Sequence, residues 1–156
     1  MATDKKQAKR DVSIVNRRAS FEYHILQTYD AGMVLKGTEV KAIREGKANL
    51  ADAFCYFLHG ELYIKNLHIS EYKQATYNNH DAKRVRKLLL TKRELVKMEA
   101  KAKEKGFTII PVRMYTSERG FVKLEIAYAQ GKKFFDKRNS IKEKDVKREL
   151  DRTVKR

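Results

Sequence analysis

The chain is poor in the residues and runs that mark secreted and membrane proteins. Its 156 residues include one cysteine, Cys55, which cannot form an internal disulfide. This suits a reducing compartment, and the sequence predicts a buried thiol. No run is long and apolar enough to cross a bilayer, and the basic N-terminus lacks the apolar stretch of a secretory signal. No strongly amphipathic basic helix with bulky anchors supports a role on anionic lipid.

Motifs for catalysis, metal binding and nucleotide binding are also missing. Gly46-Lys47 lacks the upstream glycine of a phosphate loop, and Ala48 replaces its serine or threonine. The four histidines show no metal-ligand spacing among themselves or with Cys55, so each is expected to be structural. No serine lies in a nucleophile elbow. The sequence therefore predicts a protein that is not an enzyme and that needs no metal or other cofactor.

Acidic residues are scarce relative to basic ones. Lysine and arginine number 36 against 20 acids, which gives a net charge of +16 and a pI near 9.9. Such an excess favours a phosphate-rich partner, because neutralised phosphates release condensed counterions. A merely solvated basic surface is the alternative. The charge is concentrated in residues 131–156, which hold eleven cations and five acids but few apolar residues. We call this segment the tail and expect it to be disordered when free.

The remaining sequence alternates between strand and helix signals. Residues 21–29 have the apolar period of a strand. Residues 38–46 predict a short helix, with Thr38 as its N-cap and Gly46 at its C′ position. Residues 53–58 and 61–67 predict a hairpin whose turn is His59-Gly60. Residues 70–86 have loop chemistry.

A second set of signals follows this loop. Residues 91–106 contain the capping box of Thr91 and Glu94, with a narrow apolar stripe along the helix. Arg93, Lys97, Lys101 and Lys105 form a basic ridge, which is either solvated or in contact with RNA. Two strands, 107–115 and 121–129, complete the pattern, and Pro111 marks an edge or a bulge.

The order strand, hairpin, helix, hairpin predicts a mainly β (α+β) fold. We expect a small antiparallel barrel resembling the oligonucleotide-binding fold, with accessory helices. A parallel α/β fold would need regular strand–helix alternation, which is absent. The expected organisation is a flexible basic arm over 1–15, an RNA-binding barrel over 16–130, and the disordered basic tail over 131–156.

Cations and rings are interleaved at two places outside the tail. These are Asn16, Arg17 and Arg18 before Phe21 and Tyr23, and Arg84, Arg86 and Lys87 after Tyr77 and His80. Unpaired RNA bases stack on aromatic or guanidinium planes while cations hold the backbone, so both stretches are candidate RNA-binding surfaces. Alternatively, the rings of the first stretch belong to the barrel core and its arginines are only solvated.

Several longer strings resemble a known family. NRRASFEY, AGMVLKGTEVKAIREGKANLAD, NLHISEY, HDAKRVRKLLLTKREL and GKKFFDKR, in this order, are similar to the SsrA-binding proteins, also called small protein B or SmpB. The resemblance covers about 16–138. It implies a bacterial cytoplasmic protein that binds the tRNA-like domain of transfer-messenger RNA (tmRNA) and delivers it to stalled ribosomes for trans-translation. A general ribosome-associated RNA chaperone or translation factor on the same barrel is the alternative.

The resemblance also implies partners. The alanylated RNA would arrive with elongation factor Tu and GTP, although no nucleotide site is expected in this chain. The barrel would grip the RNA near its elbow, and the tail would enter the empty messenger channel beside the decoding centre of the small ribosomal subunit. Val146, Leu150 and Val154 have helical spacing, so a docked tail would present one apolar stripe.

Site residues carry over position by position. The implied RNA-facing residues are Asn16, Arg17, Asp30, Gly32, Glu39, Lys41, Lys47, Asn49, Leu89 and Lys123, with Lys132 and Lys133 at the barrel's exit. The implied ribosome-facing tail begins with Asp136, Lys137 and Arg138 and continues with the cations Lys142, Lys144, Lys147 and Arg148. Leu89 could instead be core, and Glu39 could only cap or pair within its helix.

The chain departs from the usual family pattern at five positions. These are Phe21 for a common histidine, Asp30 for glutamate, Glu71 and Ala82 for prolines, and Phe135 for tyrosine. Asp30 keeps the charge but shortens its reach, and Phe21 keeps stacking but loses a hydrogen bond. None of these departures removes a basic residue that the resemblance places against RNA. They therefore change single contacts and leave the implied function intact.

Overall fold

Six antiparallel strands close into a barrel in the computed structural model, which describes residues 11–75, 77 and 79–154. The strands are β2 (Tyr23–Met33), β4 (Phe54–Leu58), β5 (Glu61–Lys65), β7 (Arg86–Leu89), β8 (Phe107–Thr116) and β9 (Val122–Gly131). They follow the order β8-β4-β5-β7-β2-β9, and β9 pairs with β8 to close the ring. This confirms the expected α+β fold with a small barrel.

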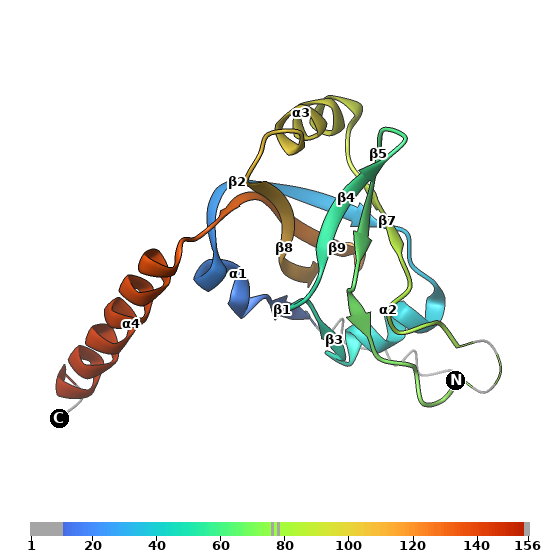
Figure 1. Cartoon of the computed structure of the whole chain (residues 1–156). Helices are drawn as coiled ribbons and strands as arrows, with labels where there is room; N and C mark the ends of the chain where they lie inside the picture. Colours follow the sequence, from blue (N-terminus) through green and yellow to red (C-terminus); the bar gives the residue numbers. More distant parts are fainter. Residues whose placement is uncertain (1–10, 76, 78, 155–156) are drawn as a thin grey trace.

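Four helices and three short strands complete the structure. They are β1 (Ser13–Val15), α1 (Arg17–Glu22), α2 (Gly37–Arg44), β3 (Ala48–Asn49), β6 (His68–Ile69), α3 (Lys92–Ala102) and α4 (Phe134–Val154). Figure 1 shows α3 at one end of the barrel and α4 projecting away from it near α1. β3 and β6 form a separate two-stranded sheet.

Alternation along β9 sets the core. Val122, Leu124 and Ile126 are buried, whereas the intervening Lys123 and Glu125 are partly exposed. β8 contributes Met114 on the same inner side and shifts register between Pro111 and Arg113. Pro111, which has no N–H to give to a ladder, therefore lies at a bulge, as expected.

The predicted turn and cap chemistry is confirmed. His59 and Gly60 join β4 to β5 and both have positive φ, as a two-residue type I′ hairpin turn requires. At the start of α3, the backbone N–H of Glu94 donates to the Thr91 hydroxyl at 3.3 Å, and the N–H of Thr91 donates to the Glu94 carboxylate at 3.0 Å. Met98 on α3 is fully buried against the barrel.

Three local expectations are wrong. Residues 13–15 belong to β1, which pairs with β8, rather than to a flexible arm; residues 1–10 lie outside the described chain. Phe21 lies in α1, not in a strand, so β2 begins only at Tyr23. Lys36, not Thr38, is the N-cap of α2, because the Glu39 carboxylate accepts from the Lys36 backbone N–H.

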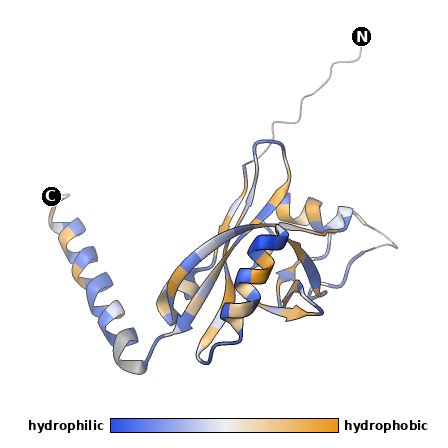
Figure 2. Ribbon diagram, turned by 90° about the horizontal axis from the view of Figure 1, so that it is seen from above, coloured by the Kyte–Doolittle hydropathy of each residue, from blue (hydrophilic) through white to orange (hydrophobic). Residues whose placement is uncertain are grey.

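The tail also differs from the expected disorder. Residues 134–154 form α4, a single helix of 21 residues. This stretch contains no glycine or proline, and opposite charges at i+4, such as Glu143 and Lys147, favour a helix. Figure 2 shows α4 as mostly hydrophilic, with apolar positions interspersed. All described side chains from 141 to 154 are exposed, so α4 packs little of its apolar stripe against the barrel.

Packing at α3 leads to a stability prediction. Met98→Ala should lower the free energy of unfolding by about 2–5 kcal/mol, because it removes a fully buried side chain and leaves a cavity. Val96→Ala, on the same helix but 61% exposed, should change it by less than about 0.5 kcal/mol. Urea denaturation of both variants measures the difference. Equal effects would contradict the packing of α3.

Candidate RNA-binding surface

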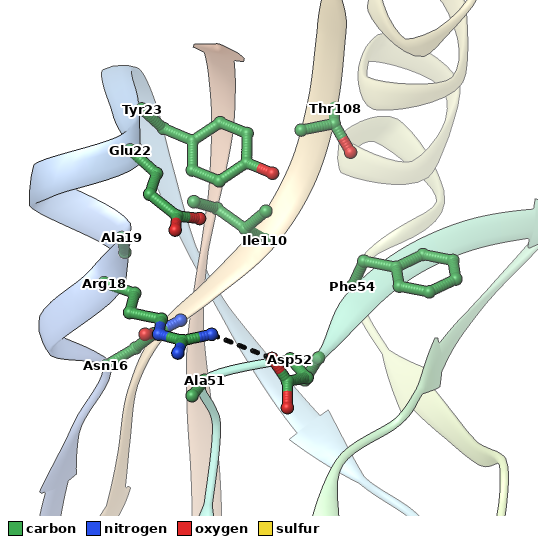
Figure 3. A pocket seen from close by; sticks show the side chains of 11 residues that line it. Asn16, Arg18, Ala19, Glu22, Tyr23, Ala51, Asp52, Phe54, Thr108 and Ile110 are labelled. Atoms are coloured by element: carbon green, nitrogen blue, oxygen red, sulfur yellow. Dashed lines mark hydrogen bonds and ion pairs between the residues drawn. The ribbon is translucent and has the colours of Figure 1, made fainter. Parts of the chain in front are cut away.

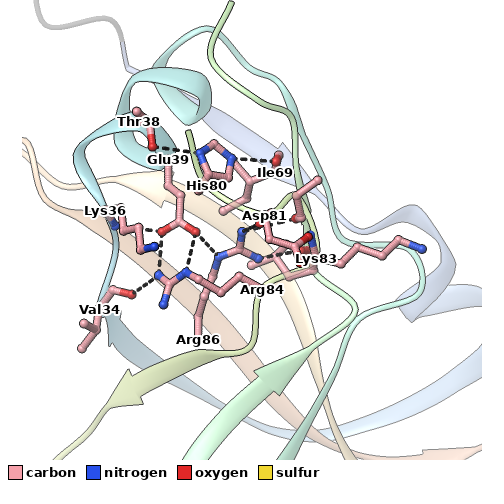
Figure 4. A network of polar contacts seen from close by, with 12 residues as sticks. Val34, Lys36, Thr38, Glu39, Ile69, His80, Asp81, Lys83, Arg84 and Arg86 are labelled. Carbon is pink, nitrogen blue, oxygen red and sulfur yellow. Dashed lines mark hydrogen bonds and ion pairs between the residues drawn. The ribbon is translucent and has the colours of Figure 1, made fainter. Parts of the chain in front are cut away.

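A buried ion network fixes α2 against the loop before β7 (Figure 4). The Glu39 carboxylate is fully buried and accepts hydrogen bonds from Arg84 at 2.8 and 3.0 Å and from Arg86 at 2.8 Å. Arg86 is also fully buried, and its remaining N–H groups donate to the carbonyls of Leu67, Asp81 and Ala82. Both guanidinium groups are thus held by the same acid.

The protonation of Glu39 follows from this setting. Burial alone would raise its pKa, but hydrogen bonds from Arg84 and from the Lys36 backbone, with the charge of Arg86, lower that pKa from 4.5 to about 2. For Arg86, burial outweighs the attraction of Glu39 and lowers its pKa. Glu39 therefore remains ionised at neutral pH.

The loop between β6 and β7 is anchored at two further points. His80 is buried, and its Nε2–H donates to the Ile69 carbonyl at 2.9 Å. A carbonyl only accepts, so in the neutral ring Nδ1 accepts from the Thr38 hydroxyl at 2.9 Å. The Asn79 side chain exchanges two hydrogen bonds with the backbone of Tyr72. His80 is therefore structural, and the loop has a fixed base.

Burial contradicts RNA contact for two of the predicted residues. The side chains of Glu39 and Arg86 are 0% exposed, so neither can touch RNA without unfolding the network. Arg84 is partly exposed, but its guanidinium group donates hydrogen bonds to Glu39 and to the Val34 carbonyl. Glu39 caps α2, as the alternative held, but its ion-pair partners Arg84 and Arg86 lie outside this helix. These three residues position α2 and the loop.

Three other predicted residues meet on neighbouring strands. Gly32 on β2 is in register with Leu89 on β7 and with Lys123 on β9. Leu89 is 50% exposed, which contradicts the alternative that it is a core residue. A Cβ at Gly32 would lie 3.3 Å from the Leu89 Cβ, so glycine lets Leu89 lie close over β2. We call Gly32, Leu89 and Lys123 the strand cluster.

Asp30 lies two residues before Gly32 on β2, on the same outer face as the strand cluster. It is exposed, and its carboxylate accepts from the Tyr115 hydroxyl at 3.0 Å. Burial, together with this bond, raises the pKa of Tyr115. The Arg113 guanidinium lies 4.6 Å from the centre of the Tyr115 ring. Asp30 therefore orders a ring and a cation on the outer face of the barrel.

A second group of predicted residues surrounds α1, at the opposite end of β2 (Figure 3). Arg17 and Arg18 are exposed, and Arg18 pairs with Asp52 at 3.1 Å. Arg18 lines a pocket of about 310 Å³, together with Glu22 and Tyr23. Gly32 lies nine residues after Tyr23 on β2. At a rise of about 3.3 Å per strand residue, this group lies roughly 30 Å from the strand cluster.

Asn16 lies beside this group, but its side chain is buried and stabilises the fold. Its side chain is 6% exposed and donates to the carbonyls of Leu50 and Pro111. This burial contradicts a direct side-chain contact with RNA. Its Oδ1 is one of two buried side-chain atoms without a partner among the described residues. Tyr23 packs on a small cluster of Ala19, Ile110, Ala127 and Ala129, so the core interpretation holds for this ring.

The base of α4 lies next to α1. Lys132 donates to the Ser20 carbonyl and to the Ser140 hydroxyl, both at 2.9 Å. Lys144 lies 5.9 Å from the Phe21 ring centre, and Lys133 is exposed. Phe21 is thus partly covered by a cation of α4 rather than placed in the core. The exposed cations of α4 include Arg138, Lys142, Lys144, Lys147 and Arg148.

Four predicted residues remain, on α2, in the segment that follows α2, on β3 and on β7. Lys41 on α2 lies 5.4 Å from the Tyr72 ring centre, and Lys47 pairs with Glu45 at 3.1 Å. Asn49 on β3 is exposed and accepts from the Ala51 N–H. Lys87 pairs with Glu61 at 2.8 Å on the outer face of β7. Lys87 lies two residues before Leu89 on the same outer side of β7 and so borders the strand cluster, whereas Lys41, Lys47 and Asn49 lie on none of its three strands.

Sequence reasoning missed three residues near the strand cluster. Arg44, Arg119 and Phe121 line one pocket together with Gly32, Leu89 and Lys123. Phe121 is 65% exposed and directly precedes β9, although the sequence predicted that it begins this strand. Cys55 is buried, which confirms the expected buried thiol, and this burial raises its pKa.

Within 11–75, 77 and 79–154, no group of three or more His, Cys, Asp or Glu side chains is arranged to hold a metal ion. In the same ranges, no helix combines the length and the apolar character that a bilayer crossing demands.

The buried network predicts a pH effect. Because the pKa of Glu39 lies below its unfolded value, its stabilising contribution is present above about pH 4.5 and is lost as pH falls towards 2. Glu39→Gln should lower the unfolding free energy at pH 7 by about 3–5 kcal/mol, since Arg86 then lacks its buried counter-charge, and should remove this acid-side loss.

Glu61→Gln is the matched control. It breaks the exposed pair with Lys87 and should cost less than about 1 kcal/mol. Denaturation at a series of pH values measures both variants. The network would be contradicted by a Glu39→Gln protein as stable as the Glu61→Gln protein at pH 7.

Comparison with known proteins covers nearly the whole chain. The family model described as SmpB protein matches residues 13–156. An SsrA-binding protein of Phocaeicola vulgatus is 57% identical over 93% of this chain and 97% of its own length, and one of Bacteroides thetaiotaomicron is 56% identical over the same shares. A solved chain described as "tmRNA-SmpB: a journey to the center of the bacterial ribosome" is 47% identical, with a TM-score of 0.68 over 78% of this chain and 85% of that one. On these similarities, the chain belongs to the SmpB protein family.

Proposed function

We propose that this protein binds the tRNA-like domain of tmRNA and delivers it to stalled ribosomes for trans-translation. The observation that carries the proposal is the strand cluster, where three positions expected to face RNA meet on adjacent strands with Leu89 half exposed. Support also comes from the relatives, which are named SsrA-binding proteins, and from the solved structure of tmRNA-SmpB.

The two ends of β2 serve two partners. The strand cluster, with the ordered Asp30–Tyr115–Arg113 group beside it, holds the tRNA-like domain. The α1 end carries the exposed Arg17 and contacts α4, which enters the empty messenger channel beside the decoding centre of the small ribosomal subunit. Separate surfaces allow the protein to hold both partners at once.

The chemistry is binding and delivery, without turnover. Alanylated tmRNA arrives with elongation factor Tu and GTP, and neither GTP nor a metal has to be held by this chain. The protein is therefore not an enzyme, needs no cofactor, and works in the bacterial cytoplasm, where ribosomes translate. Its net charge of +16 draws it to both RNA partners.

Removal of α4 separates the two activities. A chain that lacks residues 134–156 should bind the tRNA-like domain almost as tightly as the full chain, because α4 lies outside the barrel. It should fail to support tagging of peptides on stalled ribosomes. Gel-shift binding and a reconstituted tagging reaction measure these activities, with the full chain as control. Equal loss of both would contradict this division of labour.

Salt reports on phosphate contacts in the same complex. If roughly six phosphates are neutralised, affinity for the tRNA-like domain should fall by about three decades between about 50 and 200 mM salt. Binding titrations across this range measure the slope. A salt-insensitive complex would show instead that base stacking and shape dominate.

A further inference from the structure

A concave site lies between α2, the end of β2, the end of β7 and the turn that joins β8 to β9. Its volume is about 480 Å³, which falls in the range of about 300–1,000 Å³ typical of small-ligand pockets. Gly32, Leu89 and Val40 line it with apolar surface. Phe121 also lines it, with 65% of its surface exposed. We call it the Phe121 pocket.

The charges around the Phe121 pocket are of one sign. Arg44 from α2, Arg119 from the turn and Lys123 from β9 line it, and none of its described lining residues is acidic. Two other pockets of the described chain differ in this respect. The pocket beside α1 contains Glu22 and Asp52, and the pocket between β4 and α3 contains Glu99. An anionic ligand with an apolar face therefore suits only the first of the three.

We propose that the Phe121 pocket holds one unstacked nucleotide of the bound RNA, an inference that rests on the proposed function. The base stacks on the ring of Phe121 and packs against Leu89, while Arg44 and Arg119 hold the adjoining phosphates. Loops of structured RNA supply such splayed bases, whereas in a duplex every base is stacked inside. Aromatic stacking of this kind tolerates any base, so the pocket selects RNA shape rather than sequence.

Gly32 keeps the pocket floor open for this nucleotide. A Cβ at this position would lie 3.3 Å from the Leu89 Cβ and 3.7 Å from its Cδ1. A side chain there would push Leu89 toward the space that the base occupies. The Glu39 network holds the opposite wall, because α2 carries both Val40 and Arg44.

Substitution of Phe121 tests the stacking contact. Phe121→Ala should weaken binding of the full chain to the tRNA-like domain of tmRNA by about five- to 100-fold, with an unchanged salt slope. Phe121→Tyr should retain binding, because the ring remains. Leu58→Ala, which removes a comparably exposed apolar side chain at the β4–β5 hairpin, should bind like the unchanged protein. Arg119→Gln should reduce the salt slope by about one, as expected for one lost phosphate contact.

A photoreactive phenylalanine analogue at position 121 locates the nucleotide. We expect crosslinks to a single unpaired nucleotide of the tRNA-like domain. Equal affinities of Phe121→Ala and the unchanged protein, both folded by circular dichroism, would overturn the pocket and leave the proposed function standing. Failure of the unchanged protein to bind this RNA would overturn both.

Discussion

The carboxylate of Glu39 lies between the guanidinium groups of Arg84 and Arg86, and the placement of α2 depends on this contact. Two cations share one buried anion, so the network satisfies Glu39 but carries a net positive charge. Hydrogen bonds from Arg86 to three backbone carbonyls offset the cost of burying it. Because α2 carries Val40 and Arg44, the same contact shapes one wall of the Phe121 pocket.

The barrel divides the positive charge of this chain between separate surfaces. The strand cluster and the α1 end lie at opposite ends of β2, and α4 extends the second surface away from the barrel. Charge brings both RNA partners close at a high rate but distinguishes them poorly. Discrimination must come from shape and stacking, for which Leu89 and Phe121 supply exposed apolar surface.

Local signals in the sequence predicted most elements, and long-range contacts account for the errors. The Thr91 capping box and the His59-Gly60 turn depend on neighbouring residues, and both are confirmed. β1 was missed because its three residues become a strand only by pairing with β8, about a hundred residues away. The burial of Glu39 was missed because its partners lie 45 and 47 residues later in the chain. The N-cap of α2 was misassigned to Thr38 for a related reason. The Glu39 carboxylate accepts a hydrogen bond from the Lys36 backbone N–H, so the helix begins after Lys36.

Preference for one structured RNA is the central claim, and competition binding tests it most directly. The full chain is bound to labelled tRNA-like domain of tmRNA at about 150 mM salt, near physiological ionic strength, and unlabelled competitors are added. We expect the unlabelled tRNA-like domain to displace the label at far lower concentration than ordinary alanine tRNA. Equal displacement by the two RNAs would identify a general RNA-binding protein of the ribosome and contradict the account.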